Sequence, residues 1–184
     1  MNSKRFGTTL LTFLVMGCAA TAQVKGSHPS EQTHFSAEVE GVDKPVTLPQ
    51  DVVAILGKDE MVRNALENEN VPAEKMPLSW FSASAIHLSN SGKVDLVVAG
   101  NPPLAGANVT TFWVFRATPH GYELVLNAPA HDLAVMNTRS RGYRDIELIS
   151  MTAVQMSSVL CRFDGARYTK YKARSEPIRS EPIR

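Results

Sequence analysis

Residues 80–122 read WFSASAIHLSNSGKVDLVVAGNPPLAGANVTTFWVFRATPHGY, and the fold is decided in this stretch. Alternating and β-branched runs predict strands at residues 80–88, 94–98, 110–116 and 122–126. Turn-forming residues separate these runs, and the two prolines of the middle loop cannot belong to a central strand because they lack an N–H group. The stretch therefore predicts four antiparallel strands joined in sequence.

A shorter version of the same pattern follows further along the chain. Two spacings recur in it, a Gly-x-x-Asp turn and an arginine six residues before a tyrosine. The matched residues are Gly92, Asp95, Arg116 and Tyr122 in the first copy and Gly142, Asp145, Arg162 and Tyr168 in the second. The pattern predicts an internal duplication with units at about 80–126 and 133–172, and the alternative is two meanders that share turn chemistry. In either case each aspartate is expected to accept backbone N–H bonds and hold its turn.

This unit resembles one blade of the FG-GAP or VCBS-type β-propeller repeats, over residues 85–126 and again over 134–172. In that family the first turn carries acidic residues that bind Ca²⁺. The corresponding positions here are His87, Ser89, Ser91, Gly92 and Asp95, of which only the glycine and the last aspartate match. Because Ca²⁺ needs several anionic or carbonyl oxygens at once, we expect no calcium site, and the sequence indicates no other metal or cofactor. Two units also cannot close a propeller, which needs at least four blades.

The N-terminal 22 residues have the pattern of a secretory signal: a basic start, a short apolar run and then small residues. The apolar run is too short to span a membrane as a helix. Two processing routes fit. Cleavage after Ala22 would release a soluble protein, whereas residues 15–18 resemble a lipoprotein box that would place a lipid on Cys18. The protein is therefore expected in the periplasm, the outer envelope or the surroundings of a bacterial cell.

The rest of the chain predicts one α+β domain between two irregular segments. Residues 23–47 contain few large apolar residues and are expected to form a flexible tether. Residues 48–172 are expected to begin with one or two helices, the second capped by Asp59, packed on about eight antiparallel strands. The two meanders either face each other as a sandwich or join into one curved sheet. Residues 173–184, which contain SEPIR twice, are predicted to be a disordered tail.

Charge suggests where a partner could bind. Without the signal the chain has 17 basic and 18 acidic residues, which gives no reason to expect nucleic acid as a partner. The turn TRSRGYRD is exceptional because guanidinium groups recognise carboxylates and phosphates in a bidentate manner. Its contact candidates are Arg139, Arg141, Tyr143 and Arg144. The alternative is a solvated turn.

The proline loop, residues 101–108, is a second contact candidate through Leu104 and Asn108, because loops often carry binding residues. A hydrolase that uses Asp95, Asp145 or His131 is an alternative, although no nucleophile elbow is present. The sequence thus favours a non-catalytic envelope protein that binds a protein or a glycan, with a small hydrolase or a structural envelope component as alternatives. It does not indicate the oligomeric state.

Overall fold

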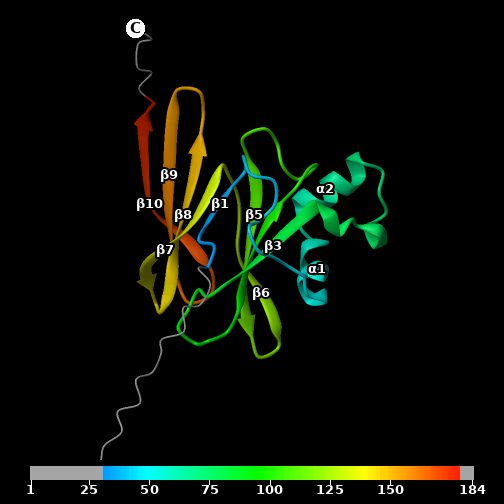
Figure 1. The fold of residues 1–184 in the computed structure, drawn as a ribbon, viewed down its shortest axis with the longest axis horizontal. Helices are drawn as coiled ribbons and strands as arrows, with labels where there is room; N and C mark the ends of the chain where they lie inside the picture. Colours follow the sequence, from blue (N-terminus) through cyan, green and yellow to red (C-terminus); the bar gives the residue numbers. More distant parts are fainter. Residues whose placement is uncertain (1–30, 179–184) are drawn as a thin grey trace, which may run out of the picture.

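The computed structural model describes residues 31–178. The predicted signal, Cys18 and the first part of the predicted tether lie outside these residues. The described part has three layers: two antiparallel sheets packed face to face, and a helical layer on the outer side of one of them (Figure 1). The α+β class and the sandwich arrangement of the two meanders are therefore observed.

The sheet next to the helices is called sheet B. Its strand order is β2-β3-β4-β5-β6, and every neighbouring pair is antiparallel. Its strands are β2 (Pro45–Val46), β3 (Phe81–Ile86), β4 (Asp95–Gly100), β5 (Thr110–Thr118) and β6 (Gly121–Ala130).

The other sheet is called sheet A. Its strand order is β1-β7-β8-β9-β10, again antiparallel throughout. Its strands are β1 (His34–Ser36), β7 (Asp132–Ser140), β8 (Tyr143–Met151), β9 (Gln155–Phe163) and β10 (Tyr168–Pro177). Each sheet thus consists of a four-stranded meander with one short N-terminal strand added at its edge.

The structure differs from the sequence prediction at the ends of the domain. Strands β1 and β2 lie in the segment predicted to be a tether, and β10 extends into the segment predicted to be a tail. β1 is held because Phe35 pairs with Leu133 and is buried between the sheets, a burial worth about 1.5–3 kcal/mol. β10 continues because its backbone pairs with β9 as far as Gln155. The described residues form ten strands rather than about eight.

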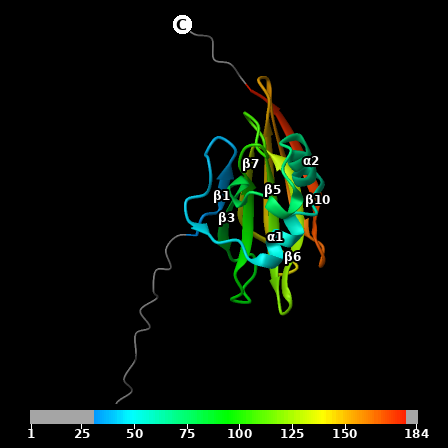
Figure 2. The same cartoon turned by 90° about the vertical axis from the view of Figure 1, so that its right-hand side faces the viewer.

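The helical layer consists of α1 (Gln50–Leu56), α2 (Glu60–Asn68) and the short 3₁₀ helices η1 (Ala73–Lys75) and η2 (Leu78–Trp80). Asp59 caps α2, because its carboxylate accepts the backbone N–H groups of Met61 and Val62. Its other oxygen accepts the indole N–H of Trp113 at 3.1 Å, which fastens the helix to β5. Figure 2 shows both helices in front of sheet B.

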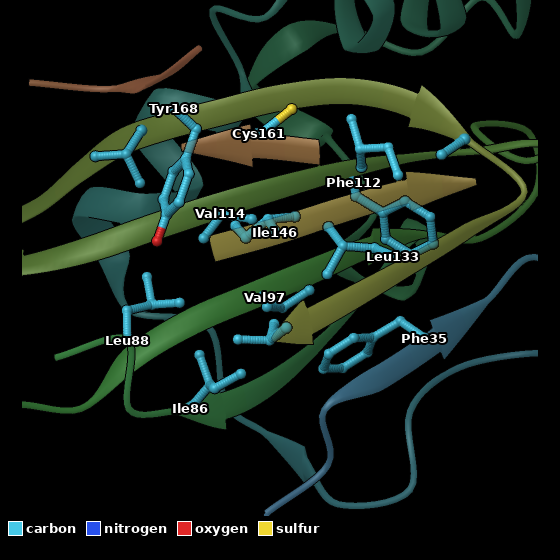
Figure 3. Close-up of a cluster of buried hydrophobic side chains, with 14 of the residues drawn as sticks. Phe35, Ile86, Leu88, Val97, Phe112, Val114, Leu133, Ile146, Cys161 and Tyr168 are labelled. Carbon is cyan, nitrogen blue, oxygen red and sulfur yellow. The ribbon is translucent and has the colours of Figure 1, made fainter. Parts of the chain in front are cut away.

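Two apolar clusters hold the layers together. One fills the space between the sheets and includes Phe35, Phe112, Leu133, Ile146 and Tyr168 (Figure 3). The other joins the helices to the outer side of sheet B, where Trp113 and Phe115 are fully buried. Both faces of β5 are therefore covered, one by sheet A and the other by the helices. This explains why β5 carries bulky side chains on both faces.

Two details recur in the meanders. Tyr122 donates a hydrogen bond from its hydroxyl to the carbonyl of Val94 at 3.1 Å, and Tyr168 donates one to the carbonyl of Arg144 at 2.7 Å. Each acceptor residue directly precedes the aspartate of a Gly-x-x-Asp turn. Each fourth strand also has a bulge three residues after its tyrosine. The bulged residues, which have no partner in the strand register, are Val125 in β6 and Tyr171 in β10.

Candidate functional site

Arg144 from the predicted arginine turn is buried, with 7% exposure. Its guanidinium donates to the carbonyls of Val135 and Met136 at 2.9 and 2.8 Å, and to the carboxylate of Glu31 at 3.0 Å. These bonds join the start of the described chain to β7 and β8. Arg144 is therefore part of the framework, and its donors face the protein rather than a ligand.

The other residues of this turn are dispersed. Arg139 donates to the carbonyls of Leu88 and Gly142, so it also connects segments of the protein. Tyr143 is half-buried, with its ring centroid 4.3 Å from that of Phe163. Arg141 is exposed at the tip with a left-handed φ of 50°. The structure thus does not bring the four candidates together into one anion-binding cluster.

The proline loop is divided in the same way. Leu104 is buried in the cluster beneath the helices, where its Cβ lies close to Gly100. Asn108 is exposed. The two predicted contact residues therefore do not share a surface.

Asp95 has the structural role expected for a Gly-x-x-Asp turn. It is fully buried, and its two carboxylate oxygens accept the N–H groups of Leu88 at 2.9 Å and Ala117 at 2.8 Å. Burial raises the pKa of Asp95 above its usual value, although both backbone bonds act in the opposite direction. Gly92 and Gly142 both have the left-handed φ that such a turn favours, at 74° and 83°.

Asp145 is equally buried but is held differently. Its Oδ2 lies 3.9 Å from Nε of Arg162, and its Oδ1 has no hydrogen-bond partner among residues 31–178. His131 is also buried, between the carboxylates of Glu38 at 3.3 Å and Asp132 at 3.0 Å. Asp95, Asp145 and His131, which the hydrolase alternative would use, are thus all buried, with exposures of 1%, 1% and 4%. Within the described part of the chain, no group of three or more His, Cys, Asp or Glu side chains is arranged to hold a metal.

A cavity of about 780 Å³ lies at the edge of sheet B, where β2 ends after two residues. Glu31 and His87 stand at this cavity with their side chains 2.9 Å apart, and Ser84 contributes a buried hydroxyl that has no partner in the described chain. A serine nucleophile requires a hydrogen bond to its base, and the hydroxyl of Ser84 makes no hydrogen bond to His87 or to any other described residue.

The outer side of sheet A is the surface that sequence reasoning missed, and it is called the open face below. Two adjacent grooves of about 240 and 230 Å³ cross it. Its outward side chains mix apolar and charged groups and are Met136, Glu147, Ile149, Met156, Ser158, Leu160, Arg162, Tyr171, Lys172, Arg174 and Glu176. No described residue covers this face in the way that α1 and α2 cover sheet B (Figure 1).

Arg162 lies at one end of the open face. Its guanidinium carbon is 3.5 Å from the ring centroid of Tyr171, a close cation–π contact. Tyr171 is 59% exposed, and the arginine itself is half-exposed. The alternation of residues 156–162 and the basic residues of β10 are sequence features that indicate this surface. They were not combined into one surface because residues 173–184 were predicted to be a disordered tail and not part of a strand.

No family model matches this chain, and neither the curated proteins nor the solved structures contain a match. Among residues 31–178, no helix has the length and apolarity needed to cross a membrane.

Proposed function

We propose that this protein is a non-catalytic, exported envelope protein that binds another protein through the open face. One observation carries the proposal: the sandwich has two similar meanders, and among residues 31–178 helices cover the outer side of only one of them. Met156 and Tyr171 remain exposed on the other, together with the half-buried Ile149 and Leu160. On this face the uncovered apolar side chains alternate with charged ones across neighbouring strands. Such a mixture supports a protein-binding role, because non-obligate interfaces are about as apolar as the rest of a protein surface.

The charges of this surface indicate the chemistry of the partner. Lys172 and Arg174 stand at the grooves with Glu147 and Glu176, and Arg162 adds a third cation nearby. Three cations against two carboxylates leave a surplus of one positive charge, which favours an acidic partner. Attraction between exposed charges is screened by salt over about 10 Å at 0.1 M, so binding is expected to weaken as ionic strength rises.

The finer architecture is also part of the proposal. We infer that the two meanders are copies of one ancestral unit, a degenerate relative of the FG-GAP or VCBS-type repeat. The matched tyrosine-to-carbonyl bonds support this inference, and so do the bulges at Val125 and Tyr171. Export to the envelope is supported by the basic and apolar pattern at the start of the chain, with either cleavage after Ala22 or lipidation of Cys18.

The test is a capture experiment with a charge-reversed surface. The chain from residue 23 onward would be immobilised and exposed to bacterial envelope extract at low and at high salt. Lys172→Glu combined with Arg174→Glu is expected to abolish retention of one protein that the wild type binds at low salt. Arg63→Glu combined with Lys75→Glu, on the exposed side of the helical layer, is the matched control and should bind normally. Equal retention by both double variants would contradict binding at the open face.

A further inference from the structure

The two proposed copies present opposite sides to each other. Tyr122 packs in the cluster beneath the helices, on the outer side of sheet B, whereas its counterpart Tyr168 lies between the sheets. The arginines show the same reversal. Arg116 extends from sheet B over rings of sheet A, whereas Arg162 lies on the open face. The two copies are thus stacked in the same orientation. The side of the first copy that packs against the second copy corresponds to the open face of the second copy.

Corresponding residues along the strands agree with this stacking. The first member of each pair lies in the apolar cluster between the sheets, and the second lies on the open face. Three such pairs are Ile86 and Met136, Val114 and Leu160, and Val125 and Tyr171. The open face is therefore equivalent in position to a surface that, in the first copy, already binds a β-sheet.

We propose that the open face binds a β-sheet of a partner protein in the way that the equivalent face of sheet B binds sheet A. Within the protein, Arg116 contacts two rings of sheet A, at 5.9 Å from the centroid of Tyr143 and 5.3 Å from that of Phe163. Arg162 is its counterpart. Its guanidinium lies over Tyr171 of the same sheet and is half-exposed, and in the complex it also contacts an aromatic ring of the partner. This inference rests on the proposed function and identifies the partner's binding surface.

The residues that differ between the inner face of sheet B and the open face indicate further properties of the partner. Leu126 and Ala128 pack against the cluster between the sheets, and their counterparts on the open face are Lys172 and Arg174. An interface that is buried permanently would have kept these positions apolar, because unpaired buried cations are costly. The partner therefore binds reversibly and presents carboxylates opposite the two basic residues.

A second copy of this chain does not offer the surface that this contact requires. The surface required is the side of a meander that carries Tyr168 in sheet A and Tyr122 in sheet B. The first lies buried between the sheets, and the second lies beneath α1 and α2. Neither is available for a neighbouring molecule, so a second copy cannot repeat the contact between the two meanders, and the proposed partner is a different protein.

Site-specific photocrosslinking tests the inference. The photoreactive residue p-benzoylphenylalanine would replace Leu160, which lines a groove, and in the control chain it would replace Arg63 on the helical layer. Each chain, from residue 23 onward, would be irradiated in envelope extract, and the crosslinked peptides would be identified by mass spectrometry. We expect position 160 alone to crosslink a different protein, at a β-strand that contains an aromatic residue and is flanked by Asp or Glu. Arg162→Ala should weaken capture of that protein roughly 2- to 30-fold, and Arg162→Lys should weaken it too because the planar cation is lost.

Several outcomes would overturn the inference. One is a crosslink from position 160 to another copy of this chain or to a helical peptide. Another is unchanged capture by a folded Arg162→Ala variant. Capture that depends on Lys172 and Arg174 without any crosslink from position 160 would leave the proposed function standing and refute the β-sheet partner. Neither capture nor crosslinking would refute both.

Discussion

Glu31 and Arg144 are 113 residues apart in sequence, and their carboxylate and guanidinium groups meet at 3.0 Å. The other oxygen of Glu31 lies 2.9 Å from Nδ1 of His87, which follows β3. One carboxylate therefore connects the residue that follows β3 of sheet B to β8 of sheet A. This contact explains why a segment with the composition of a tether joins the folded domain.

Glu31→Ala should destabilise the domain. Arg144 would remain buried without its counterion, although its bonds to the carbonyls of Val135 and Met136 would persist. We expect a loss of roughly 1–3 kcal/mol in the free energy of unfolding, measured by urea denaturation. Glu40→Ala, in the exposed loop after β1, is the control and should leave stability within about 0.5 kcal/mol. Equal midpoints for the two variants would show that the ion pair contributes nothing.

Asp95→Asn should destabilise the protein more than Asp145→Asn. Each oxygen of Asp95 accepts one backbone N–H, so an asparagine must turn its own amide N–H groups towards one of these donors. The expected loss is roughly 1–3 kcal/mol. Asp145 has an oxygen without a partner among the described residues, so its replacement should be milder. Chemical denaturation of the two variants side by side makes the comparison, and a larger loss for Asp145→Asn would refute it.

Tyr168→Phe should change both stability and its dependence on pH. Burial raises the pKa of Tyr168 above the ordinary tyrosine value of about 10, so the folded state retains the proton to higher pH than the unfolded state does. The stabilisation is complete below about pH 10 and is lost as pH rises beyond it. The variant should be about 1 kcal/mol less stable at neutral pH, from the lost hydrogen bond to Arg144, and should show a shallower alkaline decline. Thermal unfolding between pH 8 and pH 11 measures both; parallel wild-type and variant curves would contradict the assignment.

Cys161 should be chemically silent in the folded protein. It is buried between the sheets, and this burial raises the pKa of its thiol. Thiolate is the reactive form, so a thiol reagent such as Ellman's should react slowly in native buffer and stoichiometrically in denaturant. The assay uses the chain from residue 23 onward, in which Cys161 is the only cysteine. Rapid reaction under native conditions would indicate an exposed or activated thiol.

The sequence by itself was sufficient to predict the local features. The strands of residues 80–126 follow from alternation and from proline and glycine placement, and the cap at Asp59 follows from helix chemistry. Gly92 and Gly142 adopt a left-handed φ because each lies in a Gly-x-x-Asp turn that can be recognised from the sequence. These features depend on neighbouring residues, whose backbone preferences act over a few positions.

Only the tertiary structure decided where the domain begins and ends, which residues of the arginine turn are buried, and where the open face lies. β1 and β2 are too short to be seen as strands without the sheet edges that they join. Arg144 is buried because Glu31 and two carbonyls of β7 surround it, a condition that no pattern within its own turn reveals. The side of sheet A that remains uncovered depends on where the helices pack. Burial and pairing across more than a hundred residues are properties of the assembled layers, and they determine which charged groups are left to bind a partner.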